Sequence, residues 1–329
     1  MTKNSLIAAT VFAAAAWALG QGPWACELSA QQPPATEIYL APISISKEAI
    51  TVGAAKNATN NPAYDNQPGF LPDSSAFLFS SVRDGKPHDI YRYEIASGAI
   101  KQVTSVLEGE YSPTVTPDSK TFSAIRIEED KTTQRLWRFN LDGSNPQLVD
   151  KTLKVGYHVW VDATHVAVFV LSDGQGQPNT LQYVDTTTGK AEIIDKSIGR
   201  SLHMRPGTKS VSYIAKPAGG AWLVNEFDPN TKKISTITPT LDRVEDCVWL
   251  PDGRLLMATG SMLKVWTPGA LRQAQGAVSL PNGGAWTDVK DLGPGLDRIT
   301  RMAVSPDGKW LAFVAEPSTR LAARSGQAQ

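Results

Sequence analysis

This chain of 329 residues has few histidines and cysteines and no formal net charge. It has four histidines and two cysteines, and its 32 lysines and arginines balance 32 aspartates and glutamates. A chain without net charge lacks the electrostatic footprint of a protein that binds nucleic acid or an anionic membrane surface. Because 41% of the residues are hydrophobic, the chain can bury a core and is expected to be a folded globular protein.

Long hydrophobic runs are also missing, apart from one near the N-terminus. The uncharged run from Leu6 to Gly20 has 15 residues, and no stop-transfer cluster follows it. A helical membrane span needs roughly 20 apolar residues, so this run is too short. We interpret residues 1–30 as an export signal that is cleaved after Ala30. The alternatives are cleavage after Gly20 and an uncleaved anchor. The mature chain would be periplasmic or secreted and would have no membrane span.

The two cysteines have different fates under this interpretation. Cys26 lies where a lipoprotein signal would place its lipidated cysteine, but Pro23 occupies the position where a lipobox has leucine, so lipidation is disfavoured. Cleavage after Ala30 leaves Cys247 as the one remaining cysteine. A single cysteine excludes an internal disulfide, so packing must hold the fold together.

Complete catalytic motifs are absent as well. The segment from Gly199 to His203 has the spacing of a nucleophile elbow but ends in histidine where that motif has glycine, and no α/β-hydrolase domain follows it. The chain has no glycine-rich phosphate loop before a helix, no paired-cysteine zinc spacing and no acidic series of a calcium loop. These absences favour a binding protein over an enzyme.

A short motif, Pro-Asp-Gly or a variant of it, recurs between two apolar segments throughout the chain. Proline presets the backbone for a tight turn, and aspartate and glycine favour the reversal that joins two antiparallel strands. The motif recurs at intervals of 45, 44, 45, 45 and 55 residues. The six copies begin at Pro72, Pro117, Val161, Pro206, Pro251 and Pro306. Such a period indicates a repeat architecture, with an insertion in the fifth unit.

Each complete unit carries a second strand pair behind its hairpin. In the first unit these strands are predicted from Asp89 to Ile95 and from Ile100 to Thr104, with Ser97-Gly98 as the turn between them. Four strands in about 45 residues are typical of a β-propeller blade. We therefore predict an all-β fold, a six-bladed β-propeller over residues 31–316, followed by a disordered tail at 317–329.

The ends of the chain are predicted to complete the ring together. The sixth unit holds only two strands, at 302–304 and 310–314, whereas two strand-like segments at 37–43 and 49–52 precede the first unit. Two strands from each end would make a sixth four-stranded blade and leave no edge unpaired at the seam. The last blade is thus expected to be closed by the N-terminal strands.

The hairpin repeat, with a third strand of the type Ile90-Tyr91-Arg92-Tyr93, resembles the propeller of the TolB family. The resemblance covers residues from about Glu37 to Glu316. It implies a periplasmic protein that binds a partner in the cell envelope, although similar propellers occur in oligogalacturonate lyases and ahead of prolyl-oligopeptidase hydrolase domains. The α/β domain that precedes the propeller in TolB is not expected, because the first predicted strand follows the signal within a few residues.

A candidate binding site follows from the propeller geometry. The connections that enter the innermost strands surround one mouth of the central channel, opposite the Pro-Asp-Gly turns. We expect carboxylates there to face Arg200 and Arg301, and together to bind a polar ligand or a peptide terminus. The candidate residues are Asp65, Asn66, Gln67, Glu110, Tyr111, Tyr157, His158, Arg200, His203, Glu245, Asp246 and Arg301.

A metal centre at this mouth is the main alternative. His158 and His203 are one repeat apart and could approach each other, with Glu245 as a third ligand. A metal-dependent lyase or lactonase acting on a sugar acid would use such a centre. We favour instead a monomeric, non-catalytic protein without metal or cofactor, which binds a protein or peptide partner of the cell envelope on its channel-mouth face.

Overall fold

The computed structural model describes residues 35–174, 176–269, 283–293 and 295–317, which form 25 β-strands and no helix. This confirms the predicted all-β fold. Blade 1 comprises β4 (Asp65–Phe70), β5 (Ala76–Ser81), β6 (Asp89–Glu94) and β7 (Ile100–Gln102). Blade 2 comprises β8 (Glu110–Val115), β9 (Thr121–Ile127), β10 (Gln134–Asn140) and β11 (Gln147–Leu148). Blade 3 comprises β12 (Val155–Trp160), β13 (His165–Val170), β14 (Thr180–Asp185) and β15 (Lys190–Lys196).

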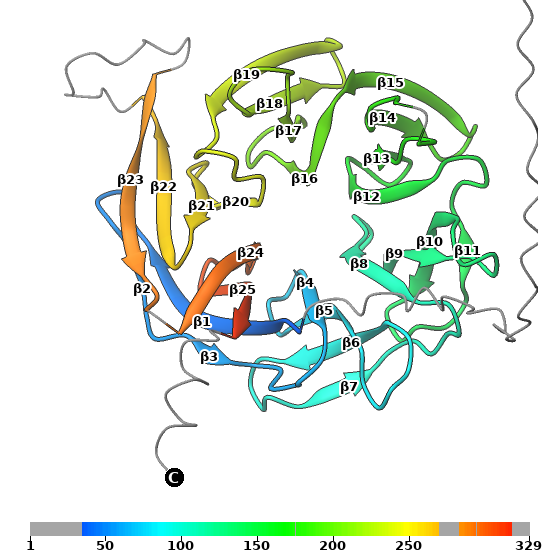
Figure 1. The fold of residues 1–329 in the computed structure, drawn as a ribbon, viewed down its shortest axis with the longest axis horizontal. Helices are drawn as coiled ribbons and strands as arrows, with labels where there is room; N and C mark the ends of the chain where they lie inside the picture. The colour runs from blue at the N-terminus through cyan, green and yellow to red at the C-terminus, as the bar shows by residue number, and fades with distance from the viewer. Residues whose placement is uncertain (1–34, 175, 270–282, 294, 318–329) are drawn as a thin grey trace, which may run out of the picture. The chain divides into compact units, whose positions relative to one another are not determined.

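The remaining blades follow the same plan. Blade 4 comprises β16 (Ile198–Met204), β17 (Val211–Ala215), β18 (Leu223–Asp228) and β19 (Lys233–Pro239). Blade 5 comprises β20 (Cys247–Trp249), β21 (Leu255–Thr259), β22 (Met262–Pro268) and β23 (Gly284–Asp291). Blade 6 comprises β24 (Leu296–Val304), β25 (Trp310–Pro317), β1 (Glu37–Ile45), β2 (Ile50–Val52) and the two-residue β3 (Lys56–Asn57). The six antiparallel sheets are arranged in a ring around a central axis (Figure 1), as the repeat predicts.

The turns between the first and second strands form for the reason that the sequence suggests. In blade 2, Asp118 Oδ1 accepts hydrogen bonds from the backbone N–H groups of Lys120 and Thr121, at 2.8 and 3.0 Å. Ser119 has a left-handed φ of 57°, and Gly308 has a φ of 69° at the matching place in blade 6. The left-handed residue completes the reversal, and the aspartate satisfies N–H groups that the turn leaves free.

Strands from both ends of the chain complete blade 6. β1 lies between β25 and β2, and it pairs with β25 in antiparallel register, with Ile38 opposite Val314 and Tyr39 opposite Phe313. This pairing confirms the predicted closure. β3 was not predicted; it pairs with β1 beside Tyr39 and Leu40.

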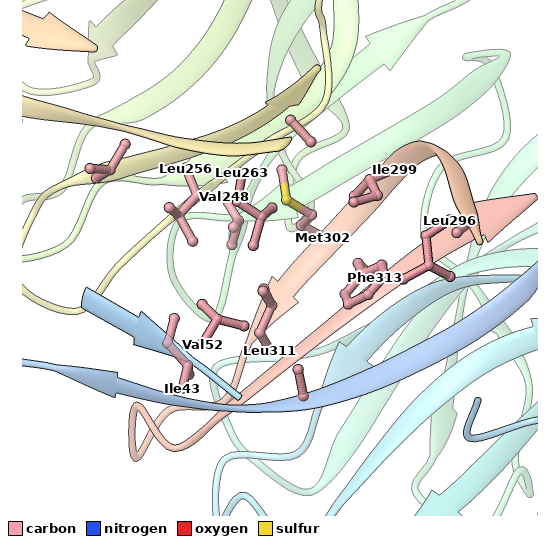
Figure 2. Close-up of a cluster of buried hydrophobic side chains, with 14 of the residues drawn as sticks. Ile43, Val52, Val248, Leu256, Leu263, Leu296, Ile299, Met302, Leu311 and Phe313 are labelled. Carbon is pink, nitrogen blue, oxygen red and sulfur yellow. The ribbon is translucent and has the colours of Figure 1, made fainter. Parts of the chain in front are cut away.

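Apolar side chains fill the wedges between neighbouring blades. Between blades 5 and 6, Val248, Leu256 and Leu263 face Leu311 and Phe313 (Figure 2), and all five are buried. Each fully buried side chain of this size contributes roughly 1.5–3 kcal/mol. Packing between sheets is therefore the main force that holds the ring together.

Tryptophan side chains also link neighbouring blades, as expected for large aromatic residues in a propeller. Trp160 donates its indole N–H to Ser123 of the preceding blade at 2.9 Å, and Trp249 donates to Ser212 in the same way at 2.7 Å. The apolar ring fills the wedge while its one polar atom finds a partner, so burial leaves no unsatisfied donor at these positions.

Several predictions fall on residues outside the described part of the chain. These are the export signal at 1–30 with Cys26, the insertion in blade 5 at 270–282, and the tail from 318 onward. Pro317, which the predicted tail included, is the last residue of β25. Within the described residues, no helix is long and apolar enough to cross a membrane.

Candidate binding site at the mouth of the axial channel

The innermost strands of the six blades surround a cavity of about 580 Å³ on the axis. Gln67, Ser112, Tyr157, Arg200 and Arg301 line it near the starts of these strands. It extends to prolines of the hairpin turns at the other end of the strands, namely Pro72, Pro206 and Pro306. Its volume is within the range of small-ligand sites, roughly 300–1,000 Å³.

Backbone irregularities occur at one level of this channel. Gln67, Ser112 and Arg301 have left-handed φ angles of 59°, 54° and 48°. Each lies where the register of its innermost strand shifts against the second strand. Each also lies five residues before the proline position of its own turn. A bulge changes the direction in which a side chain points, and non-glycine residues rarely adopt this backbone conformation. Three blades therefore place a polar side chain at the mouth at a cost in backbone strain.

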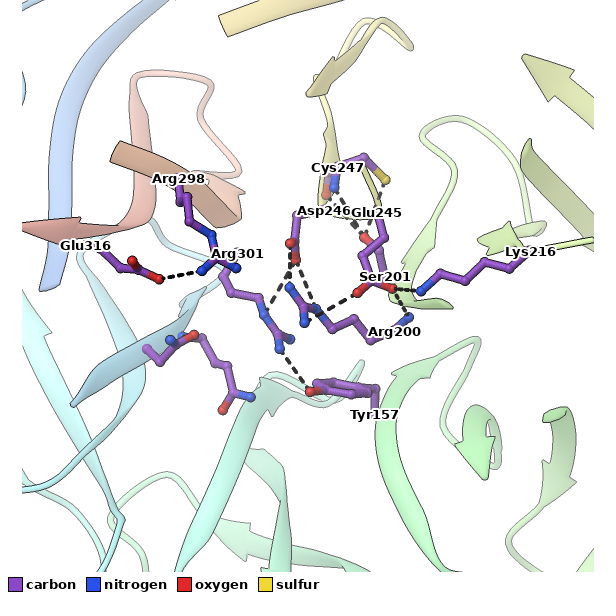
Figure 3. A network of polar contacts seen from close by, with 12 residues as sticks. Tyr157, Arg200, Ser201, Lys216, Glu245, Asp246, Cys247, Arg298, Arg301 and Glu316 are labelled. Carbon is purple, nitrogen blue, oxygen red and sulfur yellow. Dashed lines mark hydrogen bonds and ion pairs between the residues drawn. The ribbon is translucent and has the colours of Figure 1, made fainter. Parts of the chain in front are cut away.

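A network of charged side chains lies at the mouth on the side of blades 4 to 6 (Figure 3). Arg200 contacts Asp246 at 2.7 Å and Glu245 at 3.3 Å, and Lys216 contacts Glu245 at 2.6 Å. The interaction with Asp246 raises the pKa of Arg200 against the effect of burial. The arginine and the carboxylates were expected on opposite sides of the mouth, but the structure pairs them directly. Lys216, which directly follows β17, was not predicted to take part.

Arg301 differs from Arg200 in how far its donors are occupied. Its Nη2 donates to the hydroxyl of Tyr157 at 2.9 Å, its guanidinium lies 4.8 Å from the centre of the Tyr157 ring, and its Nε is 3.5 Å from Asp246. Its Nη1 has no acceptor among the described residues. Together, Arg200, Arg301 and Lys216 carry one more charge than Asp246 and Glu245 can neutralise. The mouth therefore retains one positive charge and an unoccupied donor, on a side chain that is only 17% exposed.

Asp65 and Glu110 do not line the channel, contrary to the predicted placement. Both side chains are fully buried, where Asp65 pairs with Arg83 at 3.1 Å and Glu110 pairs with Arg126 at 2.7 Å. Burial raises the pKa of both carboxyl groups, and hydrogen bonds and the arginines oppose this effect. Arg126 lies on β9 and Arg83 lies two residues after the end of β5, each in the same blade as its carboxylate, so these pairs are internal to blades 1 and 2.

The neutral candidates hold neighbouring segments together. The buried Asn66 accepts the backbone N–H of Gln67, and Gln67 Oε1 accepts the backbone N–H of Ser112 at 2.8 Å, which links blades 1 and 2. The hydroxyl of Tyr111 is 2.8 Å from Nδ1 of His88. Of these candidates Gln67 lines the channel, whereas Asn66 and Tyr111 do not.

The histidines of the channel wall are engaged separately. His158 Nε2 is 2.6 Å from Ser123 Oγ, and His203 Nε2 is 2.9 Å from Ser201 Oγ. Burial lowers the pKa of His158 to about 3 and that of His203 to about 4, so both rings are neutral near pH 7.

The donors needed for a divalent metal do not converge on these rings. Within the described residues no three His, Cys, Asp or Glu side chains are grouped as a metal site requires. Glu245, the expected third ligand, is occupied by Arg200 and Lys216. The residues therefore do not fit the metal centre of the alternative prediction.

Comparison with known proteins shows the fold. No family model and no curated protein sequence matches the chain. A structure assigned to TolB of Agrobacterium tumefaciens is 14% identical with a TM-score of 0.64, over 87% of this chain and 100% of that one. TolB of Acinetobacter baumannii is 15% identical with a TM-score of 0.52, over 85% of this chain and 64% of that one. An oligogalacturonate lyase in complex with manganese is 13% identical with a TM-score of 0.52, over 82% of this chain and 81% of that one.

These similarities define the class of the protein. The chain is a six-bladed β-propeller with the fold of the TolB propeller, and it spans less than two thirds of the length of the Acinetobacter protein. At such low identity the likeness extends to architecture, which propellers with different activities share.

Proposed function

We propose that this protein binds a protein or peptide partner at the channel mouth and does not catalyse a reaction. The observation that carries the proposal is Arg301. It is held at a left-handed φ of 48°, it lines the cavity, and it keeps an unoccupied donor beside the ring of Tyr157. A strained, partly desolvated arginine next to an aromatic ring is the kind of group that anchors a partner at an interface.

The partner belongs to the cell envelope, and the protein acts as an exported, periplasmic monomer. The apolar run at Leu6 to Gly20 supports export. The fold shared with TolB structures supports a role in protein interaction, because that likeness covers nearly all of the described propeller.

Crosslinking and affinity capture from an envelope extract tests this function. Wild-type protein is compared with Arg301→Gln, which removes the charge at the mouth, and with Arg298→Gln as a matched control. Arg298 belongs to the same strand and also has a left-handed φ of 51°, but its side chain is 74% exposed and pairs with Glu316. We expect Arg301→Gln to lose the partner and Arg298→Gln to retain it. Recovery of the same partners by all three proteins would rule out the mouth as the site.

A further inference from the structure

The wall of the channel changes in character along the axis. Charged and polar side chains line the cavity near the starts of the innermost strands, and His158 and His203 line its middle, whereas the residues just before the hairpin turns are apolar. Representative residues of this apolar part are Phe70, Val115, Val159, Met204, Trp249 and Val304. A ligand that fits the whole cavity must therefore combine an apolar group with a polar one.

The polar end selects the sign of the ligand's charge. Asp246 and Glu245 are occupied by Arg200 and Lys216, so the carboxylates of the mouth have no capacity left for a cationic ligand. Arg301 Nη1 has no acceptor among the described residues, and the group of Arg200, Arg301 and Lys216 keeps one positive charge in excess of Asp246 and Glu245. Guanidinium groups bind carboxylates through paired, charge-assisted hydrogen bonds. The preferred ligand group at this level is a carboxylate.

We propose, on the basis of the proposed function, that the channel binds the C-terminal residue of the partner. The α-carboxylate contacts Arg301, and an apolar side chain of the same residue extends into the apolar part of the channel. The rest of the partner chain leaves through the mouth. Both groups of the ligand are attached to one Cα atom, and on β24 the charged Arg301 is followed directly by Met302, Ala303 and Val304, which also line the cavity.

A chain end fits this cavity better than an internal acidic segment. An internal segment that entered from the mouth and returned through it would bring two backbone strands with it, with their polar groups against an apolar wall. A C-terminal residue inserts one side chain and leaves one chain at the mouth. Capture of a terminal carboxylate is an established mode of peptide recognition.

Binding of a labelled peptide to the full protein tests the charged contact. The peptide is a pentapeptide with fluorescein at its N-terminus and leucine at its free C-terminus, and fluorescence anisotropy measures its affinity. We expect the corresponding C-terminal amide to bind at least tenfold more weakly. Arg301→Gln should weaken the free acid at least tenfold and abolish the difference between acid and amide, whereas Arg298→Gln should preserve both. Equal binding of acid and amide by the wild-type protein would overturn the proposal.

Changes in the ligand test the apolar contact without a risk of unfolding the protein. Replacing the terminal leucine of the peptide by glycine should weaken binding at least tenfold, because the complex then no longer buries an apolar side chain. Acetate should compete only weakly; competition equal to that of the peptide would show a simple anion site and contradict the inference. Tighter binding of decanoate than of the peptide would also contradict it, since the channel would then accept a free fatty acid.

The outcomes separate this inference from the function on which it rests. Loss of the envelope partner by Arg301→Gln, together with equal binding of acid and amide peptides, would retain the mouth as a partner site and reject the C-terminal residue as its ligand. Recovery of the partner by Arg301→Gln would reject the partner site itself, whatever the peptides show.

Discussion

The charged residues of blades 1 and 2 contrast with those of blades 4 to 6. Asp65, Glu110, Arg200 and Glu245 occupy one repeat position, at multiples of 45 residues from each other. Asp65 and Glu110 pair with an arginine of their own blade and are fully buried. Arg200 and Glu245 pair with each other across a blade boundary and stay partly exposed. The position of a charged residue in the repeat therefore determines its level along the channel axis. Its ion-pair partner determines whether the side chain lies inside a blade or at the channel.

The largest expected effect is the loss of a buried partner in blade 2. Arg126→Met leaves the fully buried Glu110 without its counter-charge and should lower the free energy of unfolding by about 3–5 kcal/mol. Chemical denaturation measures this, with Arg301→Gln as the mouth counterpart, expected to cost less than about 1 kcal/mol. The double variant Arg126→Met with Glu110→Gln should recover much of the loss. A small cost for Arg126→Met would remove the distinction between the two regions.

The second effect is a dependence of stability on pH that arises from the channel wall. Burial lowers the pKa of His203 to about 4. Between about pH 6.5 and pH 4 the imidazole is therefore protonated in the unfolded chain but neutral in the folded protein. The contribution of neutral His203 to the free energy of unfolding is fully present above the unfolded pKa near 6.5. About 3 kcal/mol of it is lost as the pH falls toward 4. The difference in free energy of unfolding between wild type and His203→Asn, measured at pH 7 and pH 4.5, should shrink at the lower pH.

The buried carboxyl groups of blades 1 and 2 should show the opposite sign. Burial raises the pKa of Asp65 and Glu110 above their unfolded values, so their protonation favours the folded state. Their contribution to stability therefore increases as pH falls through the raised pKa values. A Glu110→Gln variant should lack this gain, and an unchanged pH profile for that variant would show that the carboxyl group keeps an ordinary pKa.

A smaller effect is expected from relief of backbone strain at the mouth. Ser112 has a left-handed φ of 54°, and its buried hydroxyl has no hydrogen-bond partner among the described residues. Ser112→Gly should raise the free energy of unfolding by about 1 kcal/mol. Ser123→Gly is the matched control, because Ser123 lies in a regular strand and bonds both Trp160 and His158, so its loss should destabilise the protein. Destabilisation by Ser112→Gly would argue against strain at this position.

The smallest effect is expected at Arg298. Its exposed pair with Glu316 should contribute less than about 0.5 kcal/mol, so Arg298→Gln should unfold at nearly the wild-type denaturant concentration. A loss of stability comparable to that of Arg126→Met would mean that solvent exposure does not determine how much these ion pairs contribute to the free energy of unfolding.

Local chemistry explains how much of the fold could be predicted. The Pro-Asp-Gly turns depend on residues adjacent in sequence, and counting strands between them gave the six blades and the shared last blade. β3 was missed because two residues carry no alternating pattern.

The candidate site was predicted less completely, because partner choice depends on three-dimensional geometry. The repeat predicted Arg200, Asp246 and Arg301 at the channel mouth, and all three line the cavity. It could not indicate that Asp65 would turn to Arg83 within its blade, or that Lys216 of blade 4 would reach Glu245 of blade 5. The bulges that aim Gln67 and Arg301 inward also have no signature that a single sequence reveals.

The joint between β1 and β25 has a consequence for biogenesis. β1, the first strand of the propeller to be synthesised, pairs with β2 and β3 nearby but finds its partner β25 only when the end of the chain has emerged. Until then an edge of β1 and one side of the apolar wedge beside it stay uncovered. Completion of blade 6 therefore waits for the last strand of the chain, whereas each of the other five blades consists of consecutive strands and does not depend on this joint.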